Sequence, residues 1–124
     1  MEPFEQSLPA NPAVLQGFRQ SLSNWLGGAE IGQVAQDALV LAAHEAVANG
    51  IEHGSGSPVR VQGTVENGDL VVEITTNGSW GSTSESEDTL AERGRGVALM
   101  RGLTELQLRV DDDCVVIRLR PPQP

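Results

Sequence analysis

Three polar side chains share one stripe of an otherwise small and apolar segment, "LVLAAHEAVANGIEHG" at residues 39–54. Glu45, Asn49 and His53 are spaced four residues apart, just over one turn of an α-helix, so they lie on one side of a helix. A carboxylate can act as a general base, and an amide oxygen suits a hard ion such as Mg²⁺. His53 has two open interpretations, a ligand contact or a structural histidine near a helix end. The stripe is the first candidate site.

Two glycine-bearing segments accompany this stripe. One is "TTNGSWG" at residues 75–81, after a predicted strand. The other is "ERGRGVALM" at residues 92–100, in which Gly94 and Gly96 immediately precede a helix. Free backbone amides at a helix N-terminus form a natural phosphate site, and glycines allow a phosphate to approach them closely. The residues of that second segment that could hold a phosphate are Arg93, Gly94, Arg95 and Gly96. Ordinary loops contain similar glycines, so this segment indicates a phosphate site only in combination with the polar stripe.

The first helix is expected within residues 11–28, where Asn11 is a suitable N-cap and two glycines end the pattern. Its apolar residues recur at helical spacing. Phe18, Leu22 and Trp25 on this helix form either core or part of a homodimer interface.

The remaining elements follow from periodicity and turn residues. Further helices are predicted at about residues 32–52 and 97–106, and strands at residues 4–8, 59–65, 70–75, 106–110 and 114–120. Residues 79–93, rich in Gly, Ser, Thr and acids, are predicted to form a lid, and residues 121–124 a Pro-rich tail. The order predicts one α+β domain over residues 1–124. We expect a two-layer α/β sandwich, with a mixed, mostly antiparallel sheet covered on one face by about three helices.

The charge and composition exclude several classes of function. A formal net charge of -9 argues against a nucleic-acid binder, because phosphate neutralisation needs a basic patch. The single cysteine, Cys114, excludes an internal disulfide, and no apolar run is long enough to span a membrane. These features predict a cytoplasmic protein that binds neither nucleic acid nor a membrane. A basic protein partner stays open.

The order of the motifs resembles the GHKL ATPase superfamily, whose nucleotide-binding domains form the Bergerat fold. Within it, "HEAVANGIEHG" at residues 44–54 and "ERGRGVALMRGL" at residues 92–103 resemble the bacterial anti-sigma-factor serine kinases. The resemblance covers about residues 4–120. It implies ATP and Mg²⁺ as cofactors, and a sigma factor and a small STAS-type antagonist protein as partners, with a homodimer as a further expectation.

The resemblance also implies roles for single residues. Glu45 matches the general base that would accept a proton from an attacking serine hydroxyl, and Asn49 matches the Mg²⁺ ligand. His53 closes the first motif near the nucleotide. The residues that the resemblance implies for phosphate binding are again Arg93, Gly94, Arg95 and Gly96.

Two departures from the family pattern concern adenine. The first glycine box of the family has the pattern D-x-G-x-G, and its aspartate accepts a hydrogen bond from the exocyclic amine of adenine. Alignment of this box on Gly78 puts Thr76 where the family has the aspartate, and Trp80 where it has the second glycine. A neutral hydroxyl accepts a weaker hydrogen bond than a carboxylate, with a loss of about 1–3 kcal/mol in a buried pocket. Members often begin the last strand with Gly-Thr, whereas this chain has Asp113–Cys114.

Three functions therefore stay open. The first is an ATP–Mg²⁺-dependent serine protein kinase that sequesters a sigma factor and phosphorylates its antagonist. The second is a degenerate binding module of the same fold, which works by partner exchange with weak or no ATP binding. The third and weakest is a detached catalytic domain of a sensor histidine kinase, because the sequence contains no phosphoacceptor helix pair.

Overall fold

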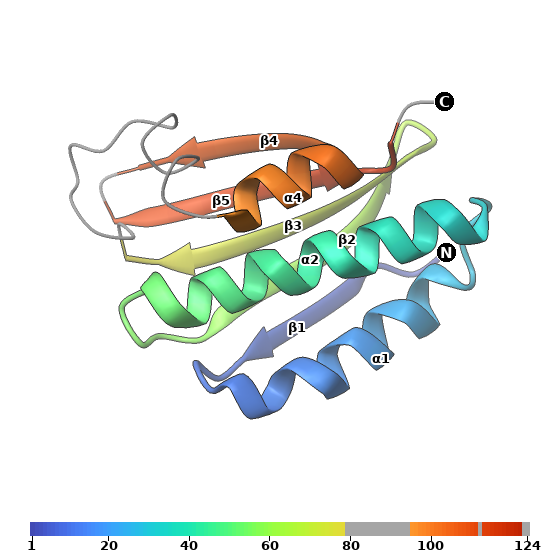
Figure 1. Ribbon diagram of the computed structural model, residues 1–124. Coiled ribbons are helices and arrows are strands. Elements are labelled where there is room, and N and C mark those ends of the chain that lie inside the picture. Colours follow the sequence, from blue (N-terminus) through green and yellow to red (C-terminus); the bar gives the residue numbers. More distant parts are fainter. Residues whose placement is uncertain (79–94, 112, 123–124) are drawn as a thin grey trace.

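A five-stranded sheet covered on one face by helices makes up the fold (Figure 1). The computed structural model describes residues 1–78, 95–111 and 113–122. The strands are β1 (Phe4–Leu8), β2 (Val59–Glu66), β3 (Asp69–Asn77), β4 (Glu105–Val110) and β5 (Cys114–Arg120). The helices are a short 3-10 turn, η1 (Pro12–Val14), followed by α1 (Leu15–Leu26), α2 (Gln33–His53) and α4 (Arg95–Leu103). The predicted α+β sandwich is confirmed. No helix in these described ranges is long and apolar enough to cross a membrane.

The sheet has the strand order β1-β2-β3-β5-β4, and every described pairing is antiparallel. The expectation of a mixed sheet is wrong in this detail. β3 precedes α4 in the chain and β4 follows it, and these two strands run parallel. They are not neighbours, because β5 lies between them and is antiparallel to both. The predicted strand at residues 4–8 is β1, which lies at one edge of the sheet.

The core lies between the helices and the inner face of the sheet. Phe18 and Leu22 of α1 are 1% and 0% exposed, so they belong to this core. Trp25 packs over Gly63 of β2, where an added Cβ would come within 2.7 Å of its ring. The indole Nε1 of Trp25 donates a hydrogen bond of 2.7 Å to the carbonyl of Glu2. The apolar face of α1 therefore packs against the core of its own chain, the first of the two roles predicted for it.

The third helix is shorter than the sequence predicts. It ends at Leu103, and the chain enters β4 at Glu105. Between the two elements, the Thr104 hydroxyl donates to the Met100 carbonyl at 2.8 Å. Buried threonines commonly bond back to the preceding turn in this way.

The β2–β3 hairpin has the turn that its sequence predicts. Asn67 and Gly68 adopt φ values of +53° and +83°. Both values lie in the left-handed region, which a two-residue type I′ turn requires. The register that follows pairs Glu66 with Asp69 and runs on to Arg60 and Thr75.

Candidate functional site

The polar stripe predicted from the sequence lies on consecutive turns of α2. Glu45 and Asn49 are half-buried, and His53, the last residue of the helix, is exposed. Ala46 and Gly50, beside them on the helix, are buried. Because α2 packs on β3 and β5, the stripe follows the boundary between the core and the surface. Polar groups placed there can reach a ligand while the rest of the helix stays in the core.

Thr76 of β3 lies directly beneath this helix. A Cβ added at Gly50 would come within 2.5 Å of the Thr76 Oγ1, and one added at Gly54 within 2.7 Å of its Cγ2. Thr76 is 1% exposed, and its hydroxyl has no hydrogen-bond partner among the described residues. An unpartnered buried hydroxyl costs about 1–3 kcal/mol, which a ligand that supplies the missing partner recovers. The hydroxyl therefore has an unused capacity to accept or donate a hydrogen bond.

Gly50 and Gly54 are the residues that the sequence analysis missed. Their missing side chains let β3 approach α2 at the stripe. The signal was present in the sequence, since two glycines four residues apart near the end of an Ala-rich helix indicate close packing on one face.

The loops that follow α2 and β3 are tied together. The Ser55 N–H donates to the Asn77 carbonyl at 3.0 Å, and the Gly78 N–H donates to the Asp113 carbonyl at 2.7 Å. Gly78 has a φ of +105°, and a Cβ there would lie 2.8 Å from the Ser55 nitrogen. The predicted first glycine box thus needs glycine at position 78 for both conformation and space.

Cys114, which stands where members of the family often begin the last strand with Gly-Thr, is not the residue of β5 that pairs with Thr76. Thr76 pairs with Val115, whereas Cys114 pairs with Asn77, and neighbouring residues of a strand face opposite sides of the sheet. Val115 thus occupies the position next to Thr76 on the helix-covered side. Burial raises the pKa of the Cys114 thiol, and the nearby carboxylate of Asp111 raises it further.

The predicted phosphate segment lies partly beyond the described residues. Trp80, Arg93, Gly94 and the predicted lid at residues 79–93 are outside them. Arg95 and Gly96 are the first residues of α4, so the helix begins two residues before the start at residue 97 that the sequence predicts. Figure 1 shows that α2 ends, β3 ends and α4 begins at the same end of the molecule. The predicted motifs at the end of α2, the end of β3 and the start of α4 therefore lie at the same end of the fold.

Metal ligation by acidic, histidine or cysteine side chains finds no support in the described ranges. No group of three or more such residues there could hold a metal ion. A Mg²⁺ ion that is bound mainly by phosphate and water needs only one or two protein oxygens. The half-buried amide of Asn49 can supply one of them.

Comparison with known proteins gives one family and a similar fold. Residues 8–120 match the family of the histidine kinase-like ATPase domain. The crystal structure of the RsbU and RsbW domains of Rv1364c from Mycobacterium tuberculosis superposes with a TM-score of 0.76 at 19% sequence identity. That alignment covers 100% of this chain and 34% of the other, so this chain spans about a third of that protein's length. No curated protein matches the chain.

Proposed function

Because this chain belongs to the histidine kinase-like ATPase domain family, we propose that it is an anti-sigma regulatory factor of the serine protein kinase type. In this role it binds ATP with Mg²⁺, sequesters a sigma factor and phosphorylates a serine of a STAS-type antagonist protein. Because a sigma factor belongs to the transcription machinery, we expect the protein in the cytoplasm. It would contact neither nucleic acid nor membrane directly. A homodimer belongs to the same proposal.

One observation carries the nucleotide part of the proposal. The unpartnered hydroxyl of Thr76 lies beneath Gly50, the residue that follows Asn49 in the chain. An adenine amine that donates to this oxygen would satisfy it. The half-buried amide of Asn49 would then bind Mg²⁺ near the phosphates, and Arg93, Gly94, Arg95 and Gly96 would hold the phosphates themselves.

Glu45 supports the kinase part. It lies one turn before Asn49 on the same side of α2, so a hydroxyl near the bound metal would be within reach of its carboxylate. A general base in that position accepts the proton of the attacking serine. His53, exposed at the end of the stripe, would contact the nucleotide.

A binding module with weak or no ATP affinity is the second candidate, and Thr76 favours it. The neutral hydroxyl lacks the charge that strengthens a hydrogen bond to the adenine amine. Such a module would regulate by partner exchange alone.

Calorimetric titration with ATP–Mg²⁺ tests the nucleotide proposal through Thr76. Thr76→Val keeps the shape of the side chain but removes the hydroxyl, so it should weaken ATP binding about 5- to 10-fold and leave inorganic triphosphate binding unchanged. Thr76→Asp should tighten ATP binding in the folded protein. Unchanged ATP affinity in Thr76→Val would contradict the placement of adenine at this hydroxyl.

Phosphate transfer separates the kinase from the module. Glu45→Ala should abolish transfer from labelled ATP to an antagonist serine and leave nucleotide binding nearly intact. Asn49→Ala should weaken nucleotide binding, and more with Mg²⁺ than without it, since a metal ligand acts on the bound phosphates. If wild type binds the antagonist but transfers no phosphate, the kinase is refuted and the module stands.

A further inference from the structure

The helices leave one end of the sheet uncovered. Val61 of β2 is 0% exposed beneath the helices, but Val65, on the same face of the same strand, is 49% exposed. The ring of Trp25 covers Gly63 between them, and Val65 lies beyond it. Figure 1 shows this end, with the β2–β3 hairpin and the loop from α1 to α2, opposite the end at which α2 ends and α4 begins. Apolar surface is therefore open at the end of the molecule that lies away from the proposed nucleotide site.

Two adjoining hollows occupy this end. The first has a volume of about 510 Å³, and its apolar lining residues are Met1, Ala29, Ile31, Val65 and Leu70. The second has a volume of about 180 Å³ and shares Ile31, Gly68 and Leu70 with the first, so the two form one depression, the distal groove. Met1 and Val65 are 59% and 49% exposed, whereas Leu70 is buried. The larger hollow has the size of a ligand-binding cleft, so the groove can receive side chains of a partner.

Carboxylates lie beside this apolar surface. Glu30 lines the first hollow, and Asp69 and Glu105 line the second. Glu30 and Asp69 are exposed, and in the part of the chain that the structure describes neither side chain forms an ion pair or a hydrogen bond. These two carboxylates are therefore available to a cationic group of a ligand.

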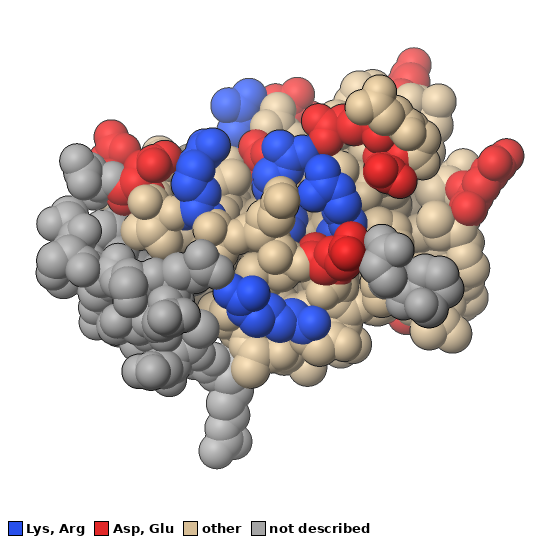
Figure 2. All heavy atoms as spheres, turned by 90° about the horizontal axis from the view of Figure 1, so that it is seen from above, with Lys and Arg blue, Asp and Glu red and all other residues tan. Residues whose placement is uncertain are grey.

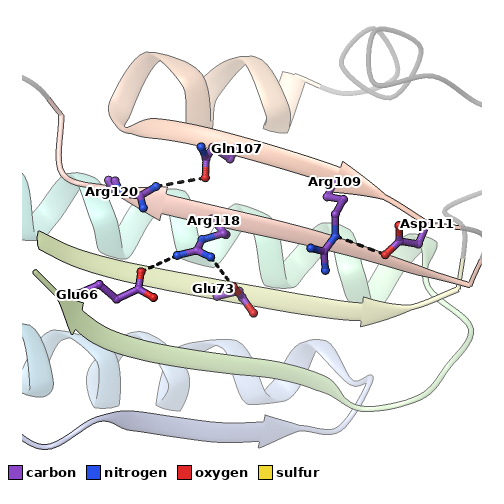
Figure 3. Close-up of polar contacts among 7 residues, drawn as sticks. All are labelled: Glu66, Glu73, Gln107, Arg109, Asp111, Arg118 and Arg120. Atoms are coloured by element: carbon purple, nitrogen blue, oxygen red, sulfur yellow. Dashed lines mark hydrogen bonds and ion pairs between the residues drawn. The ribbon is translucent and has the colours of Figure 1, made fainter.

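The arginines on the neighbouring part of the sheet are held by other partners. Arg120 lines the second hollow, but its guanidinium donates to the side chain of Gln107 at 3.3 Å. The Arg118 guanidinium lies 2.6 Å from the carboxylate of Glu66 and 3.6 Å from that of Glu73, on the sheet face away from the helices (Figure 3). In Figure 2 basic side chains lie over the middle of the molecule, and the described side chains at its right-hand end, which carries the hairpin, are acidic or uncharged. The negative charge at the groove is thus not neutralised from within the chain.

The charge of the whole chain acts in the same direction. Its formal net charge is -9, so a basic partner is attracted over a distance and an acidic peptide or an anionic lipid surface is repelled. Once the partner is bound, burial of the open apolar surface supplies the affinity. A partner segment with both properties matches the groove better than one with either property alone.

We propose that the distal groove binds a segment of a partner protein in which an apolar side chain is flanked by Lys or Arg. The apolar side chain lies against Ile31 and Val65, and the basic side chains pair with Glu30 and Asp69. The groove and Thr76 lie at opposite ends of the sheet, so this interaction does not rest on nucleotide binding.

Selection from a random peptide library displayed on phage, with immobilised wild-type protein, tests this proposal. The enriched peptides should carry Leu, Ile, Val or Met beside Lys or Arg. Calorimetric titration then measures the affinity of synthetic copies of these peptides for each variant. Val65→Ser should weaken binding about tenfold by removal of the apolar contact. Glu30→Lys and Asp69→Lys should each weaken it about three- to tenfold, and less at high salt, which screens exposed charges.

Matched variants control for general effects of these changes. Leu41→Ser on α2 removes an apolar side chain of similar exposure, 44%, that does not line the groove. Asp113→Lys makes the same charge change in the turn between β4 and β5, at the opposite end of the sheet. Both variants should bind the peptides like wild type. Thr76→Val should also bind them like wild type, so a failure of the nucleotide proposal is distinguished from a failure of this one.

Three results would overturn the proposal. The first is a selection that enriches no peptide, or peptides that are acidic or show no preference for charge. The second is wild-type peptide affinity in Val65→Ser or in both charge variants. The third is self-association of the wild-type chain, measured by sedimentation equilibrium, that Val65→Ser abolishes, since a second copy would then cover the groove. Val65, Glu30 and Asp69 are all exposed, so the variants should fold, and circular dichroism checks this.

Discussion

Gly50→Ala tests the contact between the stripe helix and the strand beneath it. A Cβ at position 50 would lie 2.5 Å from the Thr76 Oγ1, 3.3 Å from its Cγ2 and 3.2 Å from the Cγ2 of Val59. To make room for it, the Thr76 side chain must change its rotamer or the helix and β3 must move apart.

The expected loss of stability combines two opposing terms. Overpacking a tight core costs about 1–3 kcal/mol, and the preference of a helix for Ala over Gly offsets about 1 kcal/mol of this. Because the nearest contact is well below any normal approach, we expect Gly50→Ala to lose about 1–2 kcal/mol of unfolding free energy. For a chain of this size the melting temperature should fall by about 3–10 °C.

Urea unfolding of four variants measures this contact. Gly17→Ala in α1 is the matched control, because an added Cβ meets nothing within 4 Å, and it should gain about 0.5–1 kcal/mol. Thr76→Ala removes the group that the new Cβ meets, so Gly50→Ala should be tolerated in that background. If Gly50→Ala is as stable as wild type, or if Thr76→Ala does not rescue it, the close approach of α2 and β3 is refuted.

Three further predictions concern other parts of the chain. Gly63→Ala should lose about 1–3 kcal/mol of unfolding free energy, since the new Cβ would lie 2.7 Å from the Trp25 ring. Urea unfolding followed by Trp fluorescence measures this loss, and a midpoint at a higher urea concentration than that of wild type would contradict the prediction. Cys114 has a raised pKa, so at pH 8 it should react with iodoacetamide more slowly than free cysteine, as followed by mass spectrometry. Burial, and next the charge of Arg19, lower the pKa of His44, so protonation favours the unfolded chain and stability should fall as pH falls below about 6.5. His44→Gln should lose less stability than wild type between pH 7.5 and 5.5 in urea unfolding.

Local patterns in the sequence predicted most of the fold. The strand at residues 114–120 was predicted with the bounds that β5 has, since a run of β-branched residues between an acidic turn and two prolines is bounded on both sides. Asn67–Gly68 fixed the first hairpin for the same local reason. The boundary between α4 and β4 was misplaced, because Leu106 fits both a helical and an alternating pattern.

Contacts between distant parts of the chain could not be predicted in this way. The spacing of Glu45 and Asn49 needs only helical geometry, so their common side was predictable. Which face Cys114 takes depends on its register with Asn77, and that register is set by the whole sheet. The antiparallel pairing of β3 with β5 is likewise a property of strand order, which no local pattern encodes.

The surroundings of Thr76 explain how a neutral residue fits where the family pattern has an aspartate. Its side chain lies against Gly50 and Gly54, with Val59 close to the same helix position, and it is 1% exposed. A carboxylate without a partner there would be strongly penalised by burial, whereas the threonine leaves only one hydroxyl unsatisfied. Threonine therefore reduces the stability that the fold loses when this position has no ligand. Under the proposed function it would also offer adenine a weaker acceptor than an aspartate. A residue that would weaken nucleotide recognition would thus make the fold less dependent on a bound nucleotide, as the proposed binding module requires.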